Sequence, residues 1–129
     1  MRLRSYPGLA GLTDLEADVL ALIVKAHPQY GPALEAQLAK ARIASRRMTG
    51  LGFFLNFAVG EAPLMEPASF QLNEVYGQVA GLEHGAGFVL YVRGGKIDFL
   101  EGHGDDEPWP AVVEGHQVFI QSPPRGVVH

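Results

Sequence analysis

A glycine pair between two apolar runs is the feature that most constrains how this chain folds. Gly94 and Gly95 lie within the segment 81–104, GLEHGAGFVLYVRGGKIDFLEGHG, and apolar residues alternate along both flanks. Two glycines between alternating hydrophobic runs predict a β-hairpin closed by a two-residue turn. The turn fixes the register, which then pairs Arg93 with Lys96, Val92 with Ile97, Tyr91 with Asp98, Leu90 with Phe99, Val89 with Leu100 and Phe88 with Glu101.

A first helix is predicted well before this hairpin. Thr13 and Glu16 have the spacing of a capping box, in which each residue satisfies a backbone N–H group of the other. Apolar residues at helical spacing follow as far as Pro28, which cannot continue a helix. The helix should therefore span about residues 14–27.

A second helix is predicted to begin near Pro32 and to continue to about residue 48, with Gly50 as its C-terminal cap. Its last turns carry Arg42, Arg46 and Arg47. Cations at a helix C-terminus interact favourably with the exposed carbonyl groups, which explains the cluster. The alternative is a patch that binds phosphate or nucleic acid, and a net charge of -4 disfavours it.

Period-two alternation predicts strands at 51–59, at 74–80 and at 116–122, in addition to the 86–103 hairpin. Sequential strands with short links pair as neighbours, so we expect a four- to five-stranded antiparallel meander sheet. The predicted fold class is α+β, with the two N-terminal helices packed on one face of the sheet.

The length of 129 residues fits a single domain. Its 47% apolar and 19% charged residues are typical of a globular protein. We expect a lead-in (1–12), the two helices (13–48), the antiparallel sheet (51–122) and a tail (123–129).

Charge, cysteine content and apolar runs limit the functional classes. The chain has no cysteine, which excludes disulfides, thiol nucleophiles and thiolate metal sites. The longest apolar run near the amino terminus, Val19–Val24, is far too short to cross a membrane. We therefore expect a cytoplasmic protein that has no membrane partner and does not bind nucleic acid.

Three ionisable side chains gather at the open end of the hairpin. Glu101 and His103 are two residues apart on one strand and share a face, and the extended register brings His84 near them. Two imidazoles and a carboxylate can bind zinc or iron with a free coordination position. The same groups can act as general acid and base.

A structural role explains the same three residues. Glu101 ends an apolar face, where a carboxylate needs partners, and the glycine-rich turn 81–87 offers backbone N–H groups. His103 is then a surface residue. The five histidines have none of the spacings that make metal motifs specific, so we expect no cofactor while both explanations stay open.

Two further features concern surfaces. Trp109, held between Pro108 and Pro110, is predicted to cover one edge of the core. The second face of the hairpin mixes polar residues such as Tyr91 with apolar ones such as Val89. Because only two helices are present to cover the sheet, this mixed face is predicted to form a homodimer interface.

The run GLEHGAGFVLYVRGGKIDFLEGHGDDEPWP, with TGLGFFLNF before it, resembles a group of small bacterial proteins. Its members share a GLxxGAGFxLxVxxGxIxxLEG core followed by an acidic loop and Trp-Pro. The resemblance covers about Thr49 to Pro110. It implies one compact domain, and it implies no particular chemistry.

No catalytic constellation stands out from the structural explanation of its residues. We therefore expect a non-enzymatic binding or interaction protein that forms a homodimer, with a protein or small molecule as a further partner. The alternative is a small metal- or acid–base-dependent enzyme with its site at the mouth of the 86–103 hairpin. Its residues would be His84, Glu101 and His103.

Overall fold

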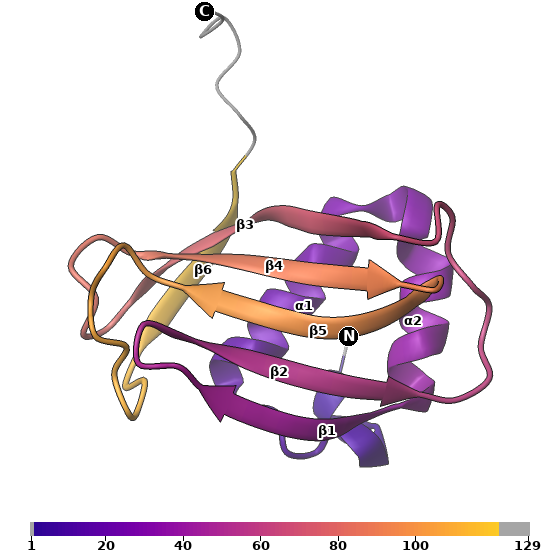
Figure 1. The fold of residues 1–129 in the computed structure, drawn as a ribbon, viewed down its shortest axis with the longest axis horizontal. Helices are drawn as coiled ribbons and strands as arrows, with labels where there is room; N and C mark the ends of the chain where they lie inside the picture. The colour runs from indigo at the N-terminus through magenta and orange to yellow at the C-terminus, as the bar shows by residue number, and fades with distance from the viewer. Residues whose placement is uncertain (1, 122–129) are drawn as a thin grey trace, which may run out of the picture.

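A helical layer and an antiparallel sheet make up the fold (Figure 1). In the computed structural model, which describes residues 2–121, helices α1 (Asp14–Ala26) and α2 (Gly31–Lys40) lie on one face of the sheet. Single-turn 3-10 helices flank them at Leu3–Ser5, Pro7–Leu9 and Pro28–Tyr30. The strands are β1 (Ala41–Met48), β2 (Gly52–Val59), β3 (Phe70–Val79), β4 (Ala86–Arg93), β5 (Lys96–His103) and β6 (His116–Ile120).

The strands do not follow sequence order across the sheet. Their order is β1-β2-β5-β4-β3-β6, and every neighbouring pair is antiparallel. The α+β class and the N-terminal position of the two helices are confirmed. The predicted four to five strands are wrong, because the sheet has six. The meander is wrong as well, because the link after β2 leads to β3 and leaves β2 beside β5.

The additional strand lies where the second helix was predicted to continue. That helix ends at Lys40, and Ala41–Met48 forms the edge strand β1 instead. Gly50, predicted as a helix cap, lies in the β1–β2 turn with a φ of 89°. Glycine adopts such angles freely in either setting. The helical assignment of residues 41–48 was wrong because pairing with β2 outweighs the local helix propensity of this segment.

The β4–β5 hairpin turns at the glycine pair, as predicted. Gly94 and Gly95 have φ angles of 61° and 78°, and Val92 pairs with Ile97. The register then shifts at a bulge, which leaves Asp98 without a direct partner. The predicted register is therefore correct beside the turn and wrong by one residue beyond it.

The bulge decides which side chains reach the core. Tyr91 lies opposite Phe99 rather than Asp98, and Leu90 lies opposite Leu100. Both leucines are buried, with 1% and 0% of their surface exposed. Phe99 and Glu101 thereby lie on the outer face of the sheet, although the sequence predicted them on the apolar face. A one-residue shift moves every later side chain to the opposite face.

The start of α1 agrees with its prediction. The Thr13 side chain accepts the N–H of Glu16 at 3.1 Å, and Oε1 of Glu16 accepts the N–H of Thr13 at 2.9 Å. The helix buries Leu15, Val19 and Ile23 against the sheet. Within the described residues, neither helix is long and apolar enough to span a bilayer.

Gln37 joins α2 to the β4–β5 turn through buried hydrogen bonds. Its side chain is fully buried, and its Nε2 donates to the carbonyl oxygens of Pro63 and Gly95, both at 2.8 Å. Its Oε1 accepts the N–H of Ile97 at 2.9 Å. One side chain thus holds α2, the β2–β3 link and the hairpin turn together.

Strands β3 and β6 were both predicted from the sequence. The strand predicted at 74–80 is present as β3 and begins earlier, and the one predicted at 116–122 is present as β6. β6 pairs with β3 at the edge of the sheet. Residue 122 and the predicted tail 123–129 lie outside the described residues.

Candidate functional site

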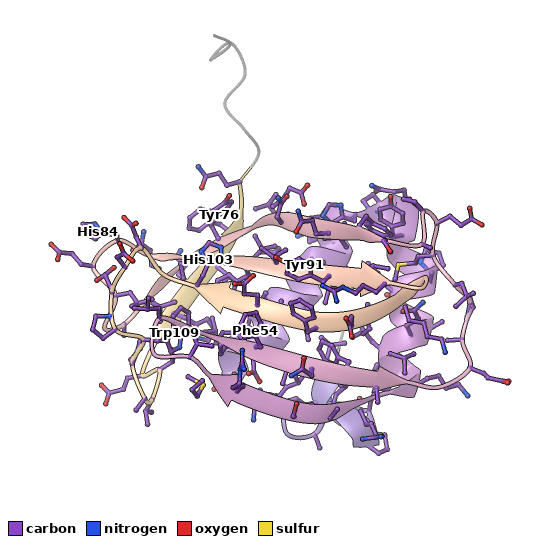
Figure 2. The ribbon with its side chains drawn as sticks, in the orientation of Figure 1. Phe54, Tyr76, His84, Tyr91, His103 and Trp109 are labelled. Carbon is purple, nitrogen blue, oxygen red and sulfur yellow. The ribbon has the colours of Figure 1, made fainter. Side chains whose placement is uncertain are left out.

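The three predicted site residues do not form a joint site. Glu101 and His103 lie on the outer face of β5, whereas His84 lies exposed in the β3–β4 turn, at the end of the sheet (Figure 2). Among residues 2–121, no three histidine, aspartate or glutamate side chains are grouped so that they could hold a metal ion.

Glu101 is engaged with a neighbouring strand. Its carboxylate accepts a hydrogen bond from the Tyr91 hydroxyl at 3.1 Å. Burial raises the pKa of Tyr91, and the hydrogen bond to Glu101 raises it further. This pair holds two side chains in place on the outer face, and the phenol is a weaker acid there than in water.

The 81–87 turn does bind a carboxylate, but from another residue. Glu107 accepts the backbone N–H of Glu83 at 2.6 Å and that of His84 at 2.8 Å. The role proposed for Glu101 therefore belongs to Glu107. The two N–H groups, that of His84 foremost, lower the pKa of Glu107.

This contact predicts a pH dependence. A carboxyl group whose pKa is lowered by folding contributes stability above its unfolded pKa, of about 4.3, and loses it as the pH falls through the folded value. We expect Glu107→Gln to lower the unfolding temperature at neutral pH, with the difference disappearing in acid. Asp105→Asn, at an exposed carboxylate nearby, is the control. A difference that is the same at every pH would contradict this role.

His103 lies across the adjacent strand. A Cβ atom added at Gly87 would lie 2.8 Å from Cε1 of His103 and 3.4 Å from the ring of Tyr76. The missing side chain of Gly87 thus makes room for the imidazole beside the phenol. His103 is exposed, as the structural explanation of this residue predicted.

Aromatic rings occupy the middle of the outer sheet face. Tyr91 and Phe99 are stacked with ring centroids 4.3 Å apart, and Phe54 meets Phe99 edge-on at 5.6 Å. The guanidinium carbon of Arg47 lies 5.3 Å from the centre of the Phe54 ring, and that of Arg93 lies 5.3 Å from the centre of Phe99. We call these five residues, which come from β1, β2, β4 and β5, the aromatic face.

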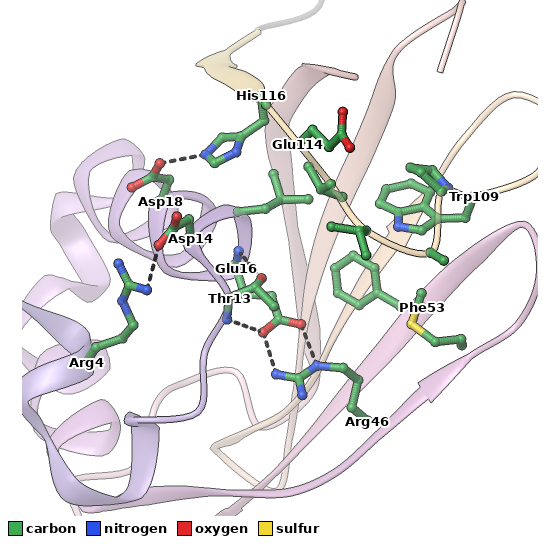
Figure 3. Close-up of a pocket in the computed structure, with 17 residues that line it drawn as sticks. Arg4, Thr13, Asp14, Glu16, Asp18, Arg46, Phe53, Trp109, Glu114 and His116 are labelled. Carbon is green, nitrogen blue, oxygen red and sulfur yellow. Dashed lines mark hydrogen bonds and ion pairs between the residues drawn. The ribbon is translucent and has the colours of Figure 1, made fainter. Parts of the chain in front are cut away.

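A cavity of about 890 Å³ lies at the N-terminal end of α1 (Figure 3). The helix, the neighbouring ends of β1 and β2, and the loop before β6 form its walls. Phe53 and Trp109 lie in the wall, in edge-to-face contact at 5.5 Å. Trp109 is 9% exposed, which confirms that it covers an edge of the core. We call this space the α1 cavity.

Paired charges line the α1 cavity. The buried Glu16 binds Arg46 through both carboxylate oxygens, at 2.7 and 2.9 Å, and this hydrogen-bonded pairing raises the pKa of Arg46. Outside that pair, Arg4 binds Asp14 at 2.6 Å and His116 binds Asp18 at 2.7 Å. Glu114 also lines the cavity, and its carboxylate pairs with no other described residue.

Two of the three arginines considered for nucleic-acid binding are therefore engaged within the chain. Arg46 binds Glu16 and the Gly11 carbonyl, and Arg47 lies over an aromatic ring. Both arginines belong to the edge strand β1. Arg46 neutralises Glu16 and Arg47 covers the ring of Phe54, so the two do not form a basic helix end.

No family model, no curated protein and no solved structure matches the chain. Its function must therefore be argued from its own residues. The sequence did not reveal the α1 cavity, because its walls come from segments about a hundred residues apart. The one sequence signal was the tryptophan between two prolines.

Proposed function

We propose that this chain is a non-enzymatic interaction module that forms a homodimer through the aromatic face. The observation that carries the proposal is the one-sided cover of the sheet. Both helices lie on the opposite face, and within residues 2–121 no helix or loop covers the aromatic face (Figures 1 and 2). An aromatic patch that no other element of a small domain covers is typical of an interaction site.

The chemistry of this face supports an interface. Aromatic residues and arginine are the side chains that protein interfaces favour. Tyr91 and Phe99 are only half-buried, and stacking holds their rings in place. A partner can therefore bury their remaining exposed surface, and the two side chains lose little conformational entropy on binding. A partner that covered the rings would remove them from water.

A second copy of the chain fits this face because the face carries both signs of charge. Arg93 lies 3.5 Å from Asp98, and Arg47 and Glu101 belong to the same face. A two-fold dimer needs a surface that complements itself. Four strands at about 4.8 Å spacing and eight residues at about 3.4 Å give roughly 520 Å² of face. A standard interface uses about 800 Å² per partner, so the area is of the required order.

Sedimentation velocity over a range of concentrations tests the dimer. We expect the wild-type chain to sediment as a dimer and Phe99→Lys to sediment as a monomer, because the substitution places a second cation beside Arg93 at the centre of the interface. Arg47→Glu is a second variant at an exposed position of the same face, and it should weaken the dimer at least tenfold.

Leu64→Lys is the matched control. Leu64 is a large apolar side chain, 61% exposed, on the β2–β3 link rather than on the sheet. Its replacement should leave the dimer unchanged. A wild-type monomer at all concentrations, or a Phe99→Lys dimer with native circular dichroism, would overturn the proposal.

The alternative function, a metal- or acid–base-dependent enzyme at the hairpin mouth, requires His84, Glu101 and His103 to act together. The position of His84 in a turn at the end of the sheet gives that alternative no support. We retain the interaction module, and we propose the cytoplasm as its location because the chain uses no cysteine.

A further inference from the structure

We propose that the α1 cavity binds a small organic cation, namely an amine carried on an apolar body about the size of one aromatic ring. This site is separate from the dimer surface. Phe53 lines the cavity and Phe54 belongs to the aromatic face, because successive residues of β2 point to opposite sides of the sheet. The volume of about 890 Å³ lies within the range of about 300–1,000 Å³ that small-molecule sites occupy.

The apolar part of the wall is in place before any ligand arrives. Leu15 and Phe53 are each 3% exposed, and Trp109 is held by a hydrogen bond from its backbone N–H to the Gly50 carbonyl at 2.8 Å. Val113, half-buried, completes this side. An aromatic or aliphatic body can pack on this wall without reorganising it, which lowers the entropic penalty of binding.

The charges select against an anion. Each basic side chain in the lining already has its own carboxylate, and Arg46 uses both its Nε and its Nη2 on Glu16. The N–H of Glu16, which a helix N-terminus could offer to an anion, is taken by Thr13. An incoming carboxylate or phosphate would have to displace one of these partners.

The same charges favour a cation. Asp14, Glu16, Asp18 and Glu114 supply four carboxylates to the lining, against the two guanidinium groups of Arg4 and Arg46 and the imidazole of His116. Glu114 has no partner among the described residues, and the side chains of Asp14 and Asp18 are 76% and 59% exposed. An ammonium group near these oxygens would gain charge complementarity, and a ring attached to it would pack against the apolar wall of the same cavity.

The chain contains a built-in reporter for this test. Trp109 is its only tryptophan, so the emission of the protein comes from the cavity wall. We would titrate the full chain with 2-phenylethylamine, with 2-phenylethanol as its neutral counterpart and with phenylacetate as the anionic one. The expected result is a saturable change in emission with the amine, at least tenfold weaker binding of the alcohol, and none of phenylacetate.

Glu114→Gln tests whether the carboxylate of Glu114 binds the amine. We expect this exposed substitution to weaken amine binding about fivefold and to leave binding of the alcohol unchanged. Glu61→Gln, at an exposed carboxylate on the β2–β3 link, should have no effect on either ligand. Added salt should weaken the amine more than the alcohol.

Three results would each overturn the proposal: no saturable response to the amine, equal affinity for amine and alcohol, or amine binding that Glu114→Gln leaves intact. Circular dichroism and the unfolding temperature verify that the variants are folded. The oligomeric state plays no part in this readout, so failure here is distinguishable from failure of the dimer.

Discussion

Gln37→Leu is expected to lower the free energy of unfolding by about 3 kcal/mol, because it leaves buried backbone groups without partners. The Ile97 N–H and the Pro63 carbonyl lose the side chain that satisfies them, while the Gly95 carbonyl keeps its bond from the N–H of Met65. Leucine is no smaller than glutamine, so the substitution removes the hydrogen bonds without leaving a cavity. Urea unfolding followed by circular dichroism measures it.

Two further variants test whether the loss of stability comes from the hydrogen bonds of Gln37. Gln29→Leu, at an exposed glutamine of the same helical layer, should change the stability by no more than about 0.5 kcal/mol. Gln37→Glu keeps the shape but places a carboxylate against two carbonyl oxygens, which disfavours its charged form. Its loss of stability should therefore grow as the pH rises. A loss of less than about 1 kcal/mol for Gln37→Leu would mean that water replaces the side chain at this site.

Gly52→Ala is expected to have a comparable effect, about 3 kcal/mol, by overpacking the contact between β2 and β5. A Cβ atom at Gly52 would lie 2.0 Å from the Gly102 carbonyl oxygen, and a backbone atom cannot rotate away as a side chain can. The pairing of β2 with β5 joins the β1–β2 hairpin to the other four strands. Strain at this contact therefore weakens the connection between these two parts of the sheet.

Gly60→Ala is the matched control for this prediction. It lies just after the same strand, and nothing lies within 4 Å of the Cβ that it would gain. The same denaturant titration should leave its stability within about 0.5 kcal/mol of wild type. Equal effects of the two substitutions would show that the contact with Gly102 is not the cause.

Local patterns predicted the parts of the fold that depend on neighbouring residues. The capping box of Thr13 and Glu16, the alternation along β2 and the Gly94–Gly95 turn all rest on contacts within a few residues, and all three are confirmed. The bulge beside Asp98 has no such signature in the residues around it, and it appears only in the pairing of β5 with β4. The assignment of Phe99 and Glu101 to a face failed for that reason.

Long-range contacts explain the remaining errors. The basic segment after Lys40 is compatible with a helix end, and only its pairing with β2 makes it a strand. The candidate site failed in a similar way: the separation along the strand correctly placed Glu101 and His103 on one face, but it did not place His84. The cavity beside Trp109 forms where segments near the two ends of the described chain meet. No pattern among neighbouring residues indicates that these segments lie together.

The strand order also has a consequence for the kinetics of folding. The β4–β5 hairpin closes over a two-residue turn, whereas the pairing of Gly52 with His103 closes a loop of about fifty residues. Loop closure of that length is slow relative to hairpin formation. We therefore expect the β2–β5 contact to form late, after the two hairpins that it connects. Substitutions there should accelerate unfolding more than they slow refolding.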